Sequence, residues 1–154
     1  MAFRGQYEHS LDAKDRITVP ARFRAAFAEG VVLAQGLEPC VEVYSESAYS
    51  SVEERFLADL NPFDREGRRT QRRFHARSED EKLDSAGRVR LPKRLIDHAG
   101  LDGPCVIAGV MNRLEIWNPE RWVAENEAID ADEEERASRA GRGGGAPDAP
   151  NPAG

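Results

Sequence analysis

Apolar and polar residues alternate strictly in two short stretches of the chain, 16–19 and 88–91. In both stretches the even positions are polar and the odd positions are apolar. Alternation with a period of two is typical of a strand that buries one face and turns the other outward. Pro20 and Pro92 come next, and proline suits the first turn of a helix because its missing N–H group would have no partner there. The pattern predicts a short strand and then a short helix at both places.

Longer apolar runs follow each of these helices. The runs 31–34 and 41–44, and later 105–110 and 114–117, are separated by turn-like residues, which predicts two hairpins. Residues 47–60 and 119–129 then have a helical pattern. Strands and helices therefore follow in the same order twice.

The two stretches belong to an internal repeat. Residues 11–23 align with residues 83–95 at an offset of 72 and share Leu-Asp-x-x-(Asp/Gly)-Arg-apolar-x-apolar-Pro-x-Arg-apolar. Such self-similarity indicates a duplicated structural unit. Asp12 and Asp84 are expected to open a turn in each copy, with Asp15 and Gly87 in the left-handed conformation that glycine adopts freely.

Charge is distributed unevenly along the chain. The net charge is −6, but residues 125–154 contain eight acids against three arginines, while residues 1–124 contain 20 acids against 19 bases. Six arginines and one acid lie between the copies, over 65–77. We interpret this segment as a solvated helix face that pairs with acids such as Asp59, Glu79 or Glu81, within one chain or across subunits, with a second DNA patch as the alternative.

Two copies of Asp-x-x-(Gly)-Arg-x-x-(Leu/Val)-Pro, about 70 residues apart with an Arg-rich segment between them, resemble the MraZ family of bacterial transcriptional regulators. The resemblance covers about residues 1–130. It implies an α+β fold in which two tandem SpoVT/AbrB-like units intertwine as a small β-barrel with flanking helices. The expected parts are a first repeat over 1–60, an Arg-rich helical connector over 61–78, a second repeat over 79–128, and an acidic, then Gly/Pro/Ala-rich disordered tail over 129–154.

The resemblance also implies a function. Members of the family form rings and bind promoter repeats upstream of the division and cell-wall gene cluster. We therefore expect a ring-like homo-oligomer that binds double-stranded promoter DNA, including its own promoter. The family motif falls on Asp12 and Arg16, and on Asp84 and Arg88. Asp15 replaces the glycine of the motif in the first copy and places an acid beside Arg16.

Cations on and beside the two strands supply the positive charge that DNA binding needs. The candidate DNA-binding residues are Lys14, Arg16, Arg22, Arg88, Arg90, Lys93 and Arg94. A two-stranded ribbon fits the major groove, and arginine can bond guanine O6 and N7. Two structural interpretations stay open: outward arginines can solvate a sheet face, and Arg16 and Arg88 can stabilise their turns by pairing with the preceding aspartates.

The remaining chemistry points away from catalysis. His9, His75 and His98 form no metal-binding spacing, and no nucleophile or phosphate-loop pattern occurs, so we expect no metal, cofactor, small-molecule substrate or enzyme activity. Cys40 and Cys105 lie in apolar stretches and are expected to be buried thiols. With no apolar run that could cross a membrane and no signal-like start, we expect a cytoplasmic, nucleoid-associated protein. An AbrB-like antitoxin and a ring-forming protein-interaction scaffold are the alternatives.

Overall fold

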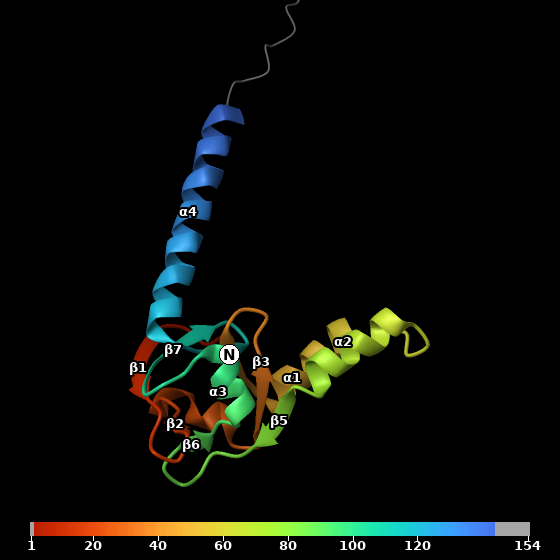
Figure 1. Ribbon diagram of the computed structural model, residues 1–154, viewed down its shortest axis with the longest axis vertical. Helices are drawn as coiled ribbons and strands as arrows, with labels where there is room; N and C mark the ends of the chain where they lie inside the picture. The colour runs from red at the N-terminus through yellow and green to blue at the C-terminus, as the bar shows by residue number, and fades with distance from the viewer. Residues whose placement is uncertain (1, 144–154) are drawn as a thin grey trace, which may run out of the picture. The chain divides into compact units, whose positions relative to one another are not determined.

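A six-stranded antiparallel sheet is the centre of the structure, a computed structural model that describes residues 2–143 (Figure 1). In spatial order its strands are β1 (Gln6–Ser10), β7 (Pro104–Val110), β8 (Arg113–Trp117), β4 (Cys40–Ser45), β3 (Val31–Gln35) and β5 (Ser78–Glu81). A separate two-stranded ribbon pairs β2 (Arg16–Thr18) with β6 (Arg88–Arg90). Both predicted hairpins are confirmed, since β3 pairs with β4 and β7 pairs with β8.

The helices follow the predicted strands in the predicted order, whereas β1 and β5 lie in segments for which the sequence predicts no strand. They are the 3-10 helix η1 (Ala21–Phe27), α1 (Glu46–Val52), the π-helical turn η2 (Glu53–Leu57), α2 (Arg65–His75), α3 (Lys93–Ala99) and α4 (Pro119–Gly143). Pro20 and Pro92 directly precede η1 and α3, as the sequence predicts. Among residues 2–143, every helix is too short or too polar to span a bilayer.

Strands from the two halves of the sequence are exchanged within the sheet. β1 pairs with β7 of the later half, and β5 pairs with β3 of the earlier half. β4 and β8, one from each half, pair at the centre. A polypeptide arranged in this way cannot be cut into two halves without exposing the edges of several strands, so each half depends on the other.

The sheet remains open, because its edge strands β1 and β5 do not pair with each other. The predicted closed β-barrel is therefore wrong, whereas the mixture of helices and strands is confirmed. β2 and β6 contain three residues each and pair with one another, so they do not join the two edges. The tandem SpoVT/AbrB-like arrangement and the bounds of its repeats stay predictions.

The main core lies between the ribbon and one face of the sheet. Ile17 and Val89 form the central pair of the ribbon and are almost fully buried there. Phe27 of η1 and Leu95 of α3 close the same cluster. The alternating apolar positions of β2 and β6 thus anchor the ribbon to the sheet, and this leaves the polar positions on its outer face.

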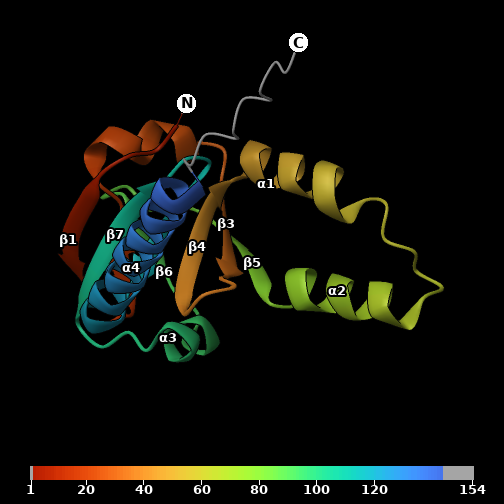
Figure 2. The ribbon, with the colours of Figure 1, turned by 90° about the horizontal axis from the view of Figure 1, so that it is seen from above.

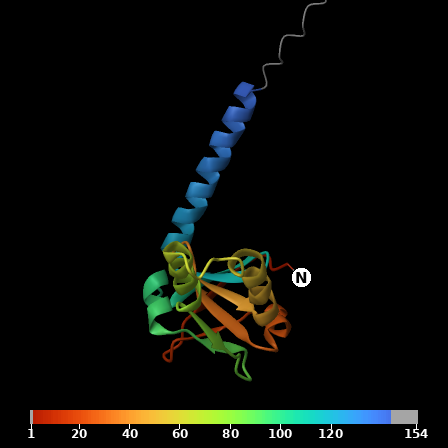
Figure 3. The same cartoon turned by 90° about the vertical axis from the view of Figure 1, so that its right-hand side faces the viewer.

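A helical arm leaves the β3–β5 side of the sheet (Figures 1 and 2). α1 and α2 lie side by side in it, joined by contacts such as Tyr49 Oη–H to the Phe74 carbonyl at 3.4 Å. Figure 3 shows the arm from its outer end, in front of the sheet. Glu79 pairs with Arg94 and, within residues 2–143, no arginine of α2 forms an ion pair. In this segment His75 Nε2 lies 3.3 Å from Glu53 Oε2, and Arg73 donates to the Gln35 and Gly36 carbonyls. Pairing of the α2 arginines with acids of a neighbouring subunit stays a prediction.

α4 is a second structural unit from Glu120 onward. It is helical to Gly143, whereas the sequence predicts disorder from residue 129. Alanine, glutamate and arginine favour helix, and Glu135 pairs with Arg139 one turn later, which explains the difference. The rest of the predicted tail, residues 144–154, lies outside the described residues.

Candidate nucleic-acid interface

The ribbon brings arginines from both copies of the repeat onto one face. Arg16 lies opposite Arg90, and Arg88 lies opposite Thr18, in the antiparallel register. These four positions alternate with the buried central pair, so their side chains share the outer face. Three cationic side chains therefore lie close together on the outer face, in the two residue pairs on either side of the buried central pair.

Two backbone hydrogen bonds extend the ribbon beyond its strands. Leu91 N–H donates to the Asp15 carbonyl and Val19 N–H donates to the Gly87 carbonyl, both at 2.9 Å. Each strand is thereby bonded to the turn that precedes the other strand, and the two turns are held as one unit. Because hydrogen-bonded and non-hydrogen-bonded pairs alternate along an antiparallel ladder, the arginines occupy the non-hydrogen-bonded pairs, where facing side chains come closest.

An aspartate connects each turn to the arginine four residues later. One carboxylate oxygen of Asp12 accepts the backbone N–H groups of Lys14 and Arg16 at 2.9 Å, and the other accepts Arg16 Nε–H at 2.7 Å. The same set of contacts surrounds Asp84, whose second oxygen accepts Arg88 Nε–H at 2.8 Å. The turn-stabilising role of the two arginines is confirmed by these contacts.

These contacts keep both aspartates ionised. Hydrogen bonds from the Arg16 backbone lower the pKa of Asp12, and hydrogen bonds from the Arg88 backbone lower the pKa of Asp84. Only Nε of each guanidinium is used, and within residues 2–143 the terminal nitrogens of Arg16 and Arg88 have no partner. Both arginine side chains are therefore fixed at their base and keep N–H groups available to a ligand.

The two turns differ at the residue before the arginine. Asp15 has φ of 59° and Gly87 has φ of 76°, so the predicted left-handed conformation is confirmed in both copies. Glycine adopts it freely, whereas aspartate does so at some cost. The first turn consequently carries an extra carboxylate that the second turn lacks.

The structure brings four of the seven predicted residues together. Arg16, Arg88 and Arg90 lie on the ribbon. Lys14 lies in the first turn, two residues before Arg16, and its backbone N–H donates to Asp12. Lys14 and Arg90 are exposed. Their participation in DNA binding stays a prediction that this geometry makes possible.

The other three predicted residues are engaged outside the ribbon. Arg22 donates to Tyr7 Oη at 2.7 Å, and Arg94 donates to the Ala76 carbonyl at 2.9 Å and pairs with Glu79 of β5. The contacts of Arg22 and Arg94 are made to β1 and to the start of β5, the two edge strands. Lys93 pairs with Asp97 one helical turn later, at 3.3 Å. Three predicted residues therefore lie away from the ribbon: Arg22, Lys93 and Arg94.

A cation that the sequence pattern did not single out lies beside the second turn. Arg24 of η1 donates from Nε to the Val19 carbonyl at 2.9 Å, and its side chain lies against Gly87. The repeat itself carries a signal for this residue, because the aligned position in the second copy is the apolar Ile96. Because the second copy has no arginine at the position of Arg24, the two turns differ in the positive charge beside them.

The described residues contain no metal centre. No group of three or more histidine, cysteine, aspartate or glutamate side chains is placed to hold a metal ion within residues 2–143. Cys40 and Cys105 are buried free thiols, as predicted, and burial raises the pKa of both. Raised thiol pKa values oppose nucleophilic or metal-binding roles for them.

Comparison of the sequence with known proteins identifies the family of this chain. The family model described as "MraZ protein, putative antitoxin-like" matches residues 2–73 and 76–142. The chain is 42% identical over 120 residues to a transcriptional regulator MraZ of Lachnoclostridium phytofermentans, covering 78% of this chain and 84% of that protein. It is 35% identical over 137 residues to a protein of the same name from Alkaliphilus metalliredigens, covering 89% of this chain and 95% of that protein. The chain belongs to the MraZ family.

Proposed function

We propose that this protein is a transcriptional regulator that binds double-stranded DNA through the outer face of the β2–β6 ribbon and the two turns bonded to it. The observation that carries the proposal is the antiparallel pairing of the two Asp-Arg motifs, which places Arg16, Arg88 and Arg90 on one face. Both of the relatives described above are named transcriptional regulator MraZ, which is the same class of function. The proposal assigns no catalytic step to the protein.

The ribbon suits the major groove for two reasons. A two-stranded antiparallel ribbon fits the width of the groove, and arginines on its outer face can reach base edges. Asp12 and Asp84 hold the Nε atoms of their arginines, so little side-chain entropy is lost when the terminal N–H groups bind. Arg90 and Lys14 supply positive charge for the phosphates on either side.

We further propose that the target consists of short repeats in the promoter upstream of the division and cell-wall gene cluster, including the protein's own promoter. A ring-like homo-oligomer would engage several repeats at once and act at the nucleoid. Linked binding units gain roughly 10²–10⁴ in apparent affinity when their spacing matches the sites. A single ribbon with a handful of phosphate contacts would bind only weakly at physiological salt.

The experiment is a footprint on the DNA just upstream of the protein's own gene. We expect protection by the wild type and its loss in Arg16→Ala/Arg88→Ala, with Arg139→Ala, an exposed arginine of α4, as the control that retains it. Gel shifts on one repeat and on several repeats then test the oligomer. Equal protection by wild type and the double variant would refute the assigned face, and equal affinity for one and several repeats would refute the ring.

The words "antitoxin-like" in the family description favour a second candidate, an AbrB-like antitoxin that binds a protein partner as well as DNA. An antitoxin co-purifies in fixed stoichiometry with one partner, whereas a regulator of the first kind is isolated as a homo-oligomer. Size-exclusion chromatography with mass spectrometry of the natively expressed protein distinguishes the two, as it does a ring-forming scaffold with another protein bound.

A further inference from the structure

A recess lies between η1 and the second turn of the interface. It has a volume of about 340 Å³ and is lined by Arg24, Phe27, Lys82, Asp84, Ser85 and Gly87, among others. Two of these residues are cations and one is an acid. The acid, Asp84, is already bonded to Arg88, so the recess offers two positive side chains to a ligand that enters it.

Arg24 is held in this recess by contacts at its base. Its Nε–H donates to the Val19 carbonyl, and a Cβ atom built on Gly87 would come within 2.2 Å of the same Nε and 2.6 Å of Cζ. Only glycine at position 87 leaves room for the guanidinium. Arg24 is therefore seated on the backbone of the second turn, and its direction is fixed by both contacts.

The two cations of the recess form no ion pair in the described part of the chain, although Lys82 also lines a second recess with Glu46, Asp80 and Glu81. Within residues 2–143, neither Arg24 nor Lys82 pairs with a carboxylate, and Arg24 uses only Nε in the hydrogen bond to Val19. Lys82 is exposed, and Arg24 is half-buried. Two cations without an ion-pair partner, one exposed and one fixed by its Nε contact, suit an anion with several oxygen atoms.

The first turn lacks the equivalent feature. At the repeat offset of 72, Arg24 corresponds to Ile96, Lys82 to Ser10, and Gly87 to Asp15. Each change removes a cation or adds an acid, and Ile96 packs against the main core. The cation of the first turn, Lys14, lies in the loop itself beside Asp15, and no residue corresponding to Arg24 supports it.

We propose that the recess of Arg24 and Lys82 binds one backbone phosphate of the DNA duplex, and that the second turn is therefore the anchoring half of the interface. This inference rests on the proposed function and extends it, since neither residue belongs to the ribbon face. It assigns the two turns unequal roles. The sequence-independent phosphate contact is made beside the second turn, with Arg24 supplied by the first copy and Lys82 by the second, and the first turn, with Asp15, binds the backbone more weakly.

The test measures binding of a fluorescent duplex carrying the protein's own upstream promoter, and of a scrambled duplex, over a series of KCl concentrations. The variants are Lys82→Gln, Arg24→Gln and Arg24→Lys, with Arg55→Gln, an exposed arginine of η2, as the matched control. We expect Lys82→Gln and Arg24→Gln each to weaken binding roughly tenfold at low salt, as the loss of one charge-assisted hydrogen bond predicts. The slope of log K against log salt should fall in magnitude by about 0.9, the value for one phosphate.

Both duplexes should lose affinity equally, because a phosphate contact carries no sequence information. Arg24→Lys should retain part of the affinity because it keeps the charge. Since Lys82 has no protein partner within residues 2–143, Lys82→Gln should unfold at the wild-type temperature, which separates lost binding from lost structure.

Several outcomes overturn the inference. Wild-type affinity and salt slope in Lys82→Gln and Arg24→Gln, while the wild type binds DNA, would exclude the recess and leave the ribbon proposal intact. A loss confined to the promoter duplex would assign these residues to base reading. If inorganic phosphate binds the wild type but not Lys82→Gln or Arg24→Gln, while both variants keep wild-type affinity for the duplexes, the recess belongs to a free anion. If the wild type binds neither duplex, the proposed function fails together with this extension.

Discussion

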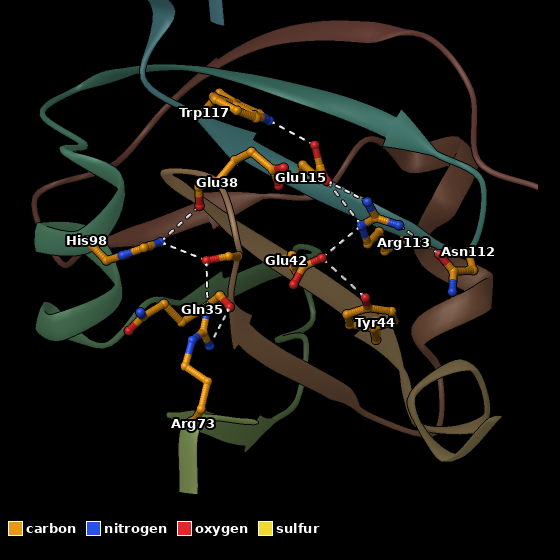
Figure 4. A network of polar contacts seen from close by, with 11 residues as sticks. Gln35, Glu38, Glu42, Tyr44, Arg73, His98, Asn112, Arg113, Glu115 and Trp117 are labelled. Carbon is orange, nitrogen blue, oxygen red and sulfur yellow. Dashed lines mark hydrogen bonds and ion pairs between the residues drawn. The ribbon is translucent and has the colours of Figure 1, made fainter. Parts of the chain in front are cut away.

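Arg113 joins two glutamates that face each other across adjacent strands (Figure 4). Glu42 of β4 is the register partner of Glu115 of β8, and the two side chains are only 14% and 8% exposed. Arg113 contacts both at 2.9 Å, through Nε and a terminal nitrogen. Tyr44 donates to Glu42 at 3.2 Å, and Trp117 Nε1–H donates to Glu115 at 3.0 Å. Without the arginine, two carboxylates would share one poorly hydrated position.

We predict that Arg113→Met lowers the free energy of unfolding by about 3–5 kcal/mol at pH 7.5, the cost of removing one partner from a buried ionic cluster. Methionine retains much of the side-chain volume, so the loss measures charge more than packing. Arg139→Met is the matched control, because Arg139 forms an exposed ion pair with Glu135 on α4. That pair should contribute no more than about 0.5 kcal/mol. Urea denaturation followed by tryptophan fluorescence measures both variants.

The loss of unfolding free energy in Arg113→Met should also depend on pH. Burial raises the pKa of Glu42 above its ordinary value of 4.5, and Arg113 opposes that rise. A carboxyl with a raised pKa in the folded state destabilises the fold as pH rises through that pKa, because its charged form is disfavoured by burial. Removing Arg113 strengthens this effect, so the loss of stability in Arg113→Met should be larger at pH 7.5 than at pH 5, because a lower pH protonates a larger fraction of Glu42. A deficit below about 1 kcal/mol at pH 7.5, or an equal deficit at both pH values, would mean that the carboxylates are hydrated and would refute this reasoning.

Three further predictions concern the ribbon and the thiols. Arg90→Thr should raise stability to urea by up to about 0.5 kcal/mol, because it removes a like-charge cross-strand pair, and it should weaken duplex binding measured by fluorescence anisotropy. Asp84→Asn should weaken duplex binding by releasing Arg88. The pKa of Asp84 is lowered in the folded state, so its carboxylate stabilises the fold above pH 3.8, and this stabilisation is lost as the pH falls below 3.8. Urea unfolding curves of wild type and variant should therefore converge as the pH is lowered below 3.8. Cys40 and Cys105 should react with a thiol reagent such as dithionitrobenzoate only in denaturant, because burial raises the pKa of both; rapid reaction in buffer would contradict the structure.

Local features of this fold could be predicted from the sequence because they depend on few residues. The alternation in β2 and β6, the prolines before η1 and α3, and the left-handed positions at Asp15 and Gly87 all follow from short-range rules. The internal repeat also predicts that both Asp-Arg turns have the same structure. Even the pairing of Asp12 with Arg16 was foreseeable as a turn contact, because both residues belong to one short loop.

Long-range features were not predictable in the same way. Arg22 contacts Tyr7 only because β1 crosses to β7, and no local pattern specifies that crossing. Glu42 and Glu115 occupy alternate polar positions of their strands, which the sequence presents as an exposed face, yet both are nearly buried. The open sheet likewise depends on where β1 and β5 end relative to each other. α4 exceeds its predicted length because helix propensity in an acidic, alanine-containing segment outweighs the absence of a buried face.

The outer face of the ribbon has an electrostatic cost that a bound anion would remove. Arg16 and Arg90 face each other at a non-hydrogen-bonded pair, and like charges so placed destabilise this sheet by up to about 0.5 kcal/mol. Asp12 offsets the charge of Arg16, but Arg90 has no acidic partner within residues 2–143. A phosphate or base edge between the two guanidinium groups would convert this repulsion into attraction. Folding stability and DNA affinity should therefore be linked, and saturating duplex should stabilise the wild type by about 2.7 kcal/mol at a free concentration one hundred times Kd. Arg90→Thr should reduce that gain through its weaker binding, even though the free variant is the more stable protein.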